Sequence, residues 1–190
     1  MKKLTKKYEE PVFKTPRMEG VKVSYGDEMG NHVLCHTIIK SKPSVAVVVR
    51  NDDNKIALIR QFRSTTGEYY IEIPAGLIEE NETEAEAAMR EVREETGLLV
   101  RGGWVLVKGP SLLDPSKSNE NYGVAIMDAY GKKGQCLDEM EQIDCEIIWM
   151  DEAEVFSKLK AQMFEGKPFH EGLFMSGHSL YALMAYMMSK

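Results

Sequence analysis

The sequence is poor in cysteine. It has three, Cys35, Cys136 and Cys145, and none of them forms a C-x-x-C pair. An odd, scattered set of this kind predicts reduced thiols in a cytoplasmic protein rather than a disulfide framework. Long apolar runs are also missing, which argues against a transmembrane helix, and the basic start Met1–Lys7 lacks the apolar run of a signal peptide. We therefore expect no membrane partner.

Positive charge is also in short supply. The 24 Lys and Arg residues are outnumbered by 30 Asp and Glu, for a formal net charge of −6. This balance argues against nucleic acid or an anionic membrane as the main partner. An anionic small substrate remains possible, because a bound metal ion changes the local sign. Internal repeats and low-complexity segments are absent, and a chain of 190 residues with 43% hydrophobic content can form one ordinary core.

Acidic residues, by contrast, are abundant between Gly76 and Leu98. Thr83 followed by Glu86 three residues later has the pattern of a capping box, which predicts a helix that begins near Thr83. Gly97 can adopt the left-handed conformation that ends a helix. The stretch therefore predicts a loop that runs into one acidic helix.

A wheel of 3.6 residues per turn separates two faces of this helix. The apolar face contains Ala85, Ala88, Met89, Val92 and Thr96. Glu91, Glu94 and Glu95 fall about 120° away, on a face expected to be exposed. Carboxylates one turn apart repel each other, so three in so short a span call for a cation. Hard oxygen ligands suit Mg²⁺ or Mn²⁺, and Mg²⁺ held in this way commonly takes phosphate oxygens as further ligands. The helix therefore predicts chemistry at a phosphate, and a solvated acidic helix without a function is the alternative.

The same stretch resembles the Nudix box, with Gly76, Glu82, Arg90-Glu91-Val92, Glu94-Glu95 and Gly97-Leu98 at the defined positions. The resemblance implies that Glu91, Glu94 and Glu95 are metal ligands and that Arg90 orients these carboxylates. The alternative for Arg90 is an ordinary ion pair one turn along the helix, with Glu86 or Glu94. It further implies that Gly76 shapes the loop and that Glu82 supports the loop and the helix.

The residues before the box narrow the resemblance to the ADP-ribose pyrophosphatase branch of the Nudix hydrolases. They are Gln61-Phe62-Arg63 and Ile71-Glu72-Ile73-Pro74-Ala75-Gly76. In that branch the arginine at the place of Arg63 binds the phosphates or the ribose of the substrate, a task suited to its planar fork of donors; otherwise Arg63 is a surface residue at a strand end. The backbone carbonyl of Ala75 is implied as a further metal ligand, and Glu72 as a group that faces the substrate. The general base is expected on the acidic loop ahead of the last strand, where we choose Glu141 over Glu139.

Hydrophobic patterns and turn residues outline the rest of the chain. Residues 1–20 are expected to be an exposed arm. Residues 21–39 read as strand, turn, strand, and a second hairpin over 44–62 turns at Asn51-Asp52-Asp53-Asn54. Further strands are expected within 99–107, 122–129 and 145–150, helices around 155–163 and 180–188 with a cap at Ser176, and a long specificity loop at 109–120. Trp149 is expected in the core. The four histidines have no metal-ligand spacing and are expected at the surface or packed on strands.

Together these patterns predict an α/β protein with the Nudix fold: an α/β/α sandwich with a mixed sheet over 44–190, preceded by a β extension within 1–43. The resemblance implies a Mg²⁺-dependent pyrophosphohydrolase that converts ADP-ribose or an ADP-sugar to AMP and a sugar phosphate. It also implies a homodimer built through the extension. In some relatives, tryptophans of the extension hold the adenine base of the substrate. Here Trp104 and Trp149 both lie outside the extension, so the resemblance implies that Tyr25 or another apolar group contacts the base, or that the base differs. Another nucleotide sugar, a dinucleoside polyphosphate, an oxidised nucleotide, a nucleotide sensor without turnover and a structural metal-binding domain remain alternatives.

Overall fold

The computed structural model describes residues 4–16, 18–107, 112, 114–131 and 145–190. The chain divides into two compact units, one formed by Met1–Pro43 with Gly109–Tyr122 and the other by Ser44–Lys108 with Gly123–Lys190. The first unit thus combines residues 1–43 with the segment 109–122. The expected boundary between a dimerisation extension and a Nudix domain stays a prediction.

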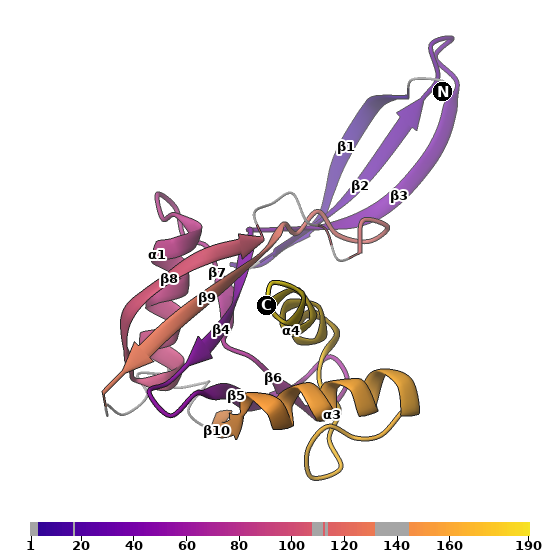
Figure 1. Ribbon diagram of the computed structural model, residues 1–190. Coiled ribbons are helices and arrows are strands. Elements are labelled where there is room, and N and C mark those ends of the chain that lie inside the picture. The colour runs from indigo at the N-terminus through magenta and orange to yellow at the C-terminus, as the bar shows by residue number, and fades with distance from the viewer. Residues whose placement is uncertain (1–3, 17, 108–111, 113, 132–144) are drawn as a thin grey trace. The chain divides into compact units, whose positions relative to one another are not determined.

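The first unit is a three-stranded antiparallel sheet with the order β1-β2-β3 (Figure 1). Its strands are β1 (Thr5–Lys14), β2 (Met18–Gly26) and β3 (His32–Ser41). An exposed arm was expected over 1–20. The residues Thr5–Lys14 are indeed exposed, but they form a strand, because β1 pairs with β2 from Thr5 opposite Gly26 to Lys14 opposite Glu19. Pro11 is tolerated because β1 is an edge strand whose register shifts between Pro11 and Phe13.

The loop before β9 is held against the end of β3 within this unit. Ile39 N donates to Lys117 O over 2.8 Å, and Asn119 N donates back to Ile39 O over 3.2 Å. The Asn119 side chain accepts a further bond from Ser41 N over 3.2 Å. Asp114 also accepts from Ser116 N over 3.1 Å, a local turn that fixes the start of this segment. The described part of the loop is thus an ordered addition to the three-stranded sheet.

The second unit is built on a sheet with the strand order β10-β5-β4-β9-β8, to which β6 and β7 add at β5 and β4. The pairs of β5 with β10, β4 and β6, of β4 with β7 and of β8 with β9 are antiparallel, whereas β4 and β9 run in the same direction (Figure 1), so the sheet is mixed, as predicted. The strands are β4 (Ser44–Arg50), β5 (Lys55–Arg63), β6 (Glu68–Glu72), β7 (Ala75–Leu77), β8 (Leu99–Val107), β9 (Tyr122–Tyr130) and β10 (Cys145–Asp151).

The hairpin between β4 and β5 turns as the sequence predicts. Asn54 has a φ of 57°, in the left-handed region that asparagine tolerates. The Asn51 side chain accepts hydrogen bonds from Asp53 N and Lys55 N over 3.0 and 2.9 Å. This Asx turn fixes the register of the two central strands.

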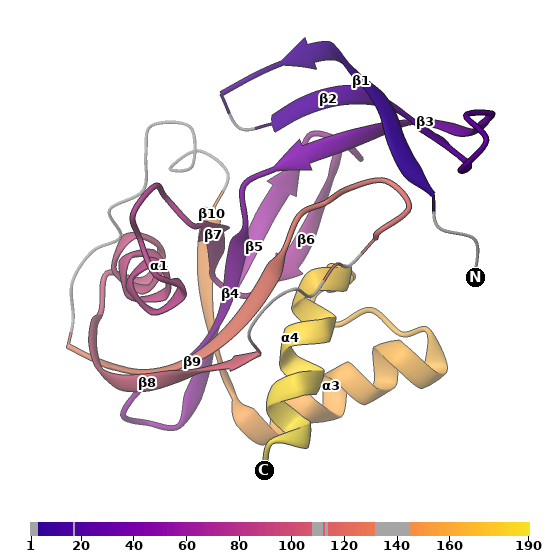
Figure 2. The same ribbon diagram turned by 90° about the horizontal axis from the view of Figure 1, so that it is seen from above.

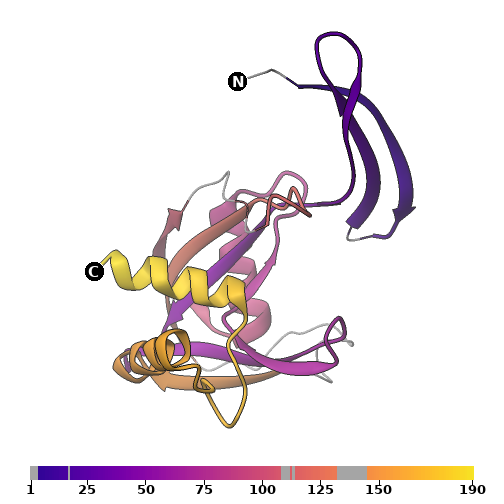
Figure 3. The ribbon, with the colours of Figure 1, turned by 90° about the vertical axis from the view of Figure 1, so that its right-hand side faces the viewer.

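Helices cover both faces of the sheet and complete the α/β/α sandwich expected from the sequence. Helix α1 (Glu84–Glu91), continued by the π-helical turn η1 (Val92–Thr96), lies on one face, and α4 (Gly177–Met188) lies on the other (Figure 2, Figure 3). Helix α3 (Glu152–Glu165) packs beside β10 and β5. None of the helices in the described ranges is both long and apolar enough to cross a membrane.

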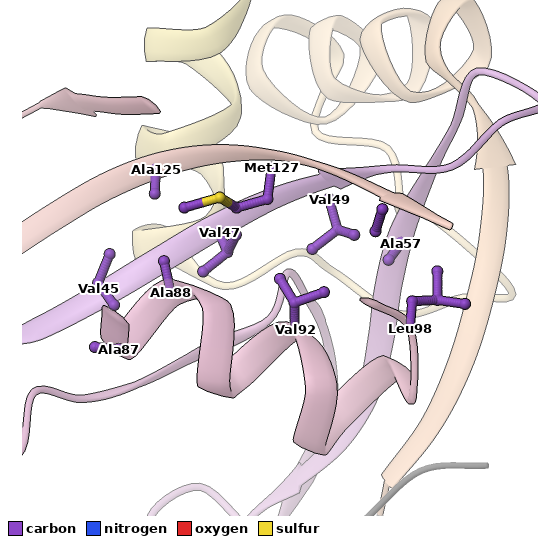
Figure 4. Close-up of a cluster of buried hydrophobic side chains, with 11 residues drawn as sticks. Val45, Val47, Val49, Ala57, Ala87, Ala88, Val92, Leu98, Ala125 and Met127 are labelled. Atoms are coloured by element: carbon purple, nitrogen blue, oxygen red, sulfur yellow. The ribbon is translucent and has the colours of Figure 1, made fainter. Parts of the chain in front are cut away.

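Strand β4 anchors α1 to the sheet. Val45, Val47 and Val49 project from one face of β4 toward Ala88 and Val92 of the helix segment, and all five are fully buried (Figure 4). The intervening residues of β4 are buried on the opposite face, as expected for a central strand covered on both sides. Burial of one valine side chain is worth about 1.5–3 kcal/mol, so this contact fixes the position of α1. Trp149, expected in the core, is only partly buried against the same cluster.

Candidate active site

The helical segment formed by α1 and η1 begins and ends where the sequence predicts. Thr83 is the N-cap, its hydroxyl accepts from Glu86 N, and the Glu86 carboxylate accepts from Thr83 N over 2.8 Å, which completes the capping box. Gly97 ends the segment with a φ of 69°. Between them, however, the last turn is a π-helix over Val92–Thr96, which the 3.6-residue wheel could not show. Such π turns often occur at functional sites.

The helix is rolled about its axis relative to the predicted wheel. Met89, expected on the buried face, is 40% exposed, whereas Glu91 and Glu95 are only 7% and 8% exposed. Ala87 is buried in place of Ala85. The expectation that all three glutamates lie on an exposed face was thus wrong for two of them, and Glu94 alone remains half-exposed. In this orientation the carboxylates of Glu91 and Glu95 face strand β7.

Strand β7 receives both buried carboxylates. A Cβ atom at Gly76 would lie 1.7 Å from Glu91 Oε1, so only glycine allows this carboxylate to rest against the strand. Ala75 N donates a hydrogen bond to Glu95 Oε2 over 3.2 Å. Gly76 also pairs with Val45 of β4, which ties the contact to the centre of the sheet. The sequence predicted that Gly76 shapes a loop; its observed role is to allow a close approach within a strand.

Arg90 binds three carboxylates at once. Its Nη1 donates to Glu91 Oε1 and to Glu94 Oε2 over 2.7 and 2.9 Å. Its Nε and Nη2 donate to the two oxygens of Glu82, each over 3.0 Å, and Nη2 also donates to Leu77 O over 2.8 Å. The predicted ion pair between Arg90 and Glu94 is thus one of several bonds. Glu86, the other predicted partner, is part of the capping box instead.

The contacts between Arg90 and Glu82 shift the pKa of both groups. The hydrogen bonds to Glu82 raise the pKa of Arg90, burial opposes this, and the bonds to Glu91 and Glu94 add to the increase. The bonds from Arg90 likewise lower the pKa of the Glu82 carboxyl against a smaller effect of burial. Because Glu82 also accepts from Glu79 N over 3.0 Å, it joins the loop after β7 to the helix.

The acidic cluster has the donor chemistry of a site for a hard divalent cation. Four carboxylates, from Glu82, Glu91, Glu94 and Glu95, are gathered around one guanidinium and the end of β7, which leaves an excess of negative charge. Oxygen donors of this kind suit Mg²⁺ or Mn²⁺. Across the described ranges, no three acidic, His or Cys side chains converge closely enough to enclose a metal ion. A cation would therefore have to draw the carboxylates inward, and Arg90 already holds Glu91 and Glu94 on one nitrogen.

A second cluster forms at the end of β5, around a buried carboxylate. Glu72 is 2% exposed, and Arg63 donates to both of its oxygens, from Nε to Oε1 over 2.9 Å and from Nη2 to Oε2. His178 Nε2 lies 3.1 Å from the same Oε2. Burial alone would raise the pKa of Glu72, but the bonds from Arg63 and His178 outweigh it and lower the pKa to about 2. The carboxylate is therefore ionised at neutral pH.

The sequence did not point to His178. We expected a surface or strand-packing histidine, but its ring lies in a polar cluster with Glu72, Ser176 and Ser179. The signal that could have found it is local: two polar residues, His178 and Ser179, open an otherwise apolar helix directly after the expected cap at Ser176. Ser176 does occupy the N-cap position of α4, although its hydroxyl donates to Ser179 Oγ over 3.1 Å and makes no cap bond.

Three expectations for the site stay predictions. Glu141 and its alternative Glu139 lie outside the described residues. Ala75 donates a hydrogen bond from its N–H to Glu95, and the role of its carbonyl as a metal ligand is untested. Arg63 and Glu72 lie together as a pair, and their contact with a substrate is likewise untested.

Comparison with known proteins places this geometry in a family. A family model described as the NUDIX domain matches residues 40–171. "Putative nudix hydrolase 2" of Caenorhabditis elegans is 34% identical over 99 residues, which cover 49% of this chain and 44% of that protein. The "ADP-ribose pyrophosphatase" of Mycobacterium tuberculosis is 29% identical over 126 residues, which cover 66% of this chain and 60% of that protein. The chain thus spans less than two thirds of either relative.

A solved structure supports the same fold over the whole chain. The crystal structure of an ADP compounds hydrolase superposes with a TM-score of 0.68 at 20% identity, over 100% of this chain and 95% of the other. Since the family match includes the acidic helix, strand β7 and the Arg63–Glu72 pair, the sequence resemblance and the observed fold agree. This chain therefore belongs to the Nudix family.

Proposed function

We propose that this protein is a Mg²⁺-dependent pyrophosphohydrolase that cleaves ADP-ribose or a related ADP-sugar to AMP and a sugar phosphate. The observation that carries the proposal is the acidic cluster of α1 and η1, with Glu91 seated on Gly76 and Arg90 bound to Glu82, Glu91 and Glu94. The names of the mycobacterial relative and of the structural neighbour support the choice of an ADP compound.

Hydrolases of this family use divalent metal ions, and here Glu91, Glu94, Glu95 and the carbonyl of Ala75 would hold them. Mg²⁺ is the proposed ion and Mn²⁺ the closest substitute. When bound, such an ion neutralises the charge that develops on the phosphates and lowers the pKa of the attacking water. Arg90 acts by holding Glu91 and Glu94 in place, because both of these carboxylates accept from its Nη1.

The remaining groups bind the substrate and move a proton. Arg63 is proposed to bind the phosphates or the ribose, since its side chain is 41% exposed while its Nε and Nη2 are fixed on Glu72. The oxygen of a water molecule bonds to one phosphorus, the bond from that phosphorus to the bridging oxygen breaks, and the bridging oxygen leaves with the other phosphate. The water's proton passes to a general base, for which Glu141 is proposed and Glu94 is the next candidate.

The test is a screen of phosphoanhydride substrates with Mg²⁺. ADP-ribose, ADP-glucose, GDP-mannose, diadenosine tetraphosphate and 8-oxo-dGTP are each incubated with the protein, and the released phosphomonoester is separated from the substrate by ion-exchange chromatography and measured. We expect ADP-ribose or ADP-glucose to be the best substrate, with no turnover after chelation of the metal. A preference for one of the other compounds would assign the enzyme to a different substrate class. Tight nucleotide binding without turnover would instead indicate a sensor.

Glu95→Gln is the matched inactive variant for this screen. It keeps the side-chain volume and an acceptor for Ala75 N, but it removes a proposed metal ligand. Turnover is expected to fall by about 10²-fold or more, since the loss of a needed electrostatic group has an effect of that size. A variant that keeps more than a tenth of the wild-type rate would remove Glu95 from the metal site.

The remaining proposals concern assembly and location. We propose a homodimer joined through the three-stranded sheet, because β1 is exposed along its whole length and the sheet also exposes apolar side chains such as Val12 and Phe13. An isolated small sheet of this kind is only marginally stable in water. A cytoplasmic location is proposed from the sparse cysteines; within the described residues, neither Cys35 nor Cys145 forms a disulfide.

A further inference from the structure

The contact between His178 and Glu72 joins two parts of the second unit that are 106 residues apart. The segment that leads into α4 runs alongside the end of β6. Ile71 N donates to Phe174 O over 3.0 Å, and Ser176 N donates to Ile71 O over 3.1 Å. On the other side of Glu72, Ile73 N donates to Ser179 Oγ over 3.0 Å. Both sequence neighbours of Glu72 are thus bonded to residues that flank His178, so the position of the imidazole is fixed by the fold.

The ionisation state of Glu72 determines which ring nitrogen of His178 carries a hydrogen atom. Glu72 is ionised at neutral pH, and an ionised carboxylate can only accept hydrogen bonds. The nitrogen that contacts it, His178 Nε2, must therefore bear hydrogen and donate. The hydroxyl of Ser176, 3.3 Å from the same nitrogen, donates to Ser179 Oγ and leaves this arrangement intact. His178 is thus a donor to Glu72 in either its neutral or its protonated form.

One carboxylate oxygen links the histidine to the arginine. Glu72 Oε2 accepts from both Arg63 Nη2 and His178 Nε2. Glu72 is 2% exposed. Its carboxylate holds the guanidinium of Arg63 in one orientation as long as the carboxylate itself does not rotate. Arg63 reaches this carboxylate along the face of β5 and β6, because its ladder partner is Glu68 whereas that of Glu72 is Ile59. A long, partly exposed side chain of this kind loses orientation easily when its anchor can turn.

We propose that His178 is a positioning residue for substrate binding, which it controls through Glu72 and Arg63. This inference rests on the proposed function, in which Arg63 binds the phosphates or the ribose of the substrate. The first turn of α4 thereby becomes part of the substrate-binding apparatus, although His178 itself contacts no substrate. Glu72, in turn, acts on the substrate through Arg63.

The test is a double-mutant cycle between His178 and Arg63. His178→Phe keeps a ring and removes the donor, whereas His178→Gln keeps a donor at about the reach of Nε2. Each is measured with Arg63 intact and with Arg63→Ala, with ADP-ribose and Mg²⁺. His170→Phe is the matched control, because its Nε2 faces Glu171 at 3.9 Å, outside both clusters. The readouts are kcat, KM, and the Kd of ADP-ribose by calorimetry in a Glu95→Gln background.

With Arg63 present, His178→Phe is expected to raise KM and Kd about tenfold, the size of a lost hydrogen bond to a charged group, and to change kcat by less than about threefold. His178→Gln should keep KM within about threefold of wild type, because it restores the donor. In the Arg63→Ala background, His178→Phe should change KM and Kd by less than about twofold, since nothing remains to be positioned. His170→Phe should behave as wild type.

A purely structural role gives a different result. If His178→Phe weakens binding equally with and without Arg63, or if it leaves KM within about twofold of wild type, the positioning role is refuted. The measurements on the wild-type protein test the proposed function separately. If wild type binds ADP-ribose without releasing AMP, the proposed activity fails while the Kd values still decide the role of His178. If ADP-ribose does not bind at all, both proposals fail.

Discussion

Replacement of Gly76 by alanine adds one methyl group at the point where β7 meets the acidic helix. An ideal Cβ at this position would stand 1.7 Å from Glu91 Oε1 and 2.1 Å from its Cδ, whereas ordinary van der Waals contact begins at 3.4 Å. The carboxylate must therefore retreat by about 1.7 Å. Its Oε1 is bound to Arg90 Nη1 over 2.7 Å and the residue is 7% exposed, so this retreat breaks the bond and displaces the carboxylate from its position against β7.

The expected cost to catalysis is large and the cost to stability moderate. Misplacement of a catalytic group by about 1 Å can lower activity 10²-fold, so Gly76→Ala should lower kcat/KM on ADP-ribose by about 10²-fold or more. Overpacking of a single methyl group costs about 1–3 kcal/mol. For a chain of this size, that corresponds to a Tm lowered by about 2–12 °C, so the variant is still folded at 25 °C.

The assay combines a Mg²⁺ titration of the ADP-ribose hydrolysis rate with a thermal unfolding scan. Gly102→Ala is the matched control, because Gly102 also lies in a strand and an added Cβ would meet nothing within 4 Å. Its kcat/KM should stay within about twofold of wild type, as is usual for surface changes. If Gly76→Ala keeps kcat/KM within about threefold of wild type, the close contact of Glu91 with Gly76 is not needed for catalysis and the reasoning fails.

Three further predictions concern other parts of the molecule. The pKa of Glu72 is lowered to about 2 from the ordinary 4.5, so its ionised form stabilises the fold above pH 4.5 by about 3 kcal/mol at most, and this contribution is lost as the pH falls through 2. In Glu72→Gln, the free energy of unfolding in urea should therefore depend less on pH over this range. An unchanged dependence on pH would exclude the assignment. Light scattering should give twice the 21.5 kDa of one chain, and a monomer mass at micromolar concentration would contradict the dimer. Glu141→Gln should lower kcat about 10²-fold while Glu139→Gln stays within about threefold; if neither lowers kcat, the base lies within the box, with Glu94 next.

Local signals in the sequence were sufficient for much of the fold. The capping box at Thr83, the helix end at Gly97 and the turn at Asn51 depend on neighbours within four residues, and each was predicted and is observed. The mixed sheet between helices followed from the order of these elements and from the family resemblance. Strand β1 was missed because all ten of its residues are exposed and its sequence has no alternation of apolar and polar residues.

The parts of the site that the sequence could not reveal depend on tertiary contacts. The roll of α1 is decided by the fit of Glu91 against Gly76, and a helical wheel contains no information about a strand on the other side. One π-helical turn has too few residues to produce a period of its own. His178 meets Glu72 only because the fold brings α4 beside β6, and a single histidine has no spacing signature.

Strand β1 also bears on how the protein behaves at high concentration. An exposed edge strand offers unpaired N–H and C=O groups that can template the stacking of one chain after another into fibres. In β1, Pro11 has no N–H to donate, the register shifts directly after it, and Lys6, Lys7 and Lys14 place charge along the edge. Proline, irregular register and lysine are the features that oppose continuous edge-to-edge pairing. These features of β1 therefore oppose the growth of a filament in which one chain pairs with the next along this edge.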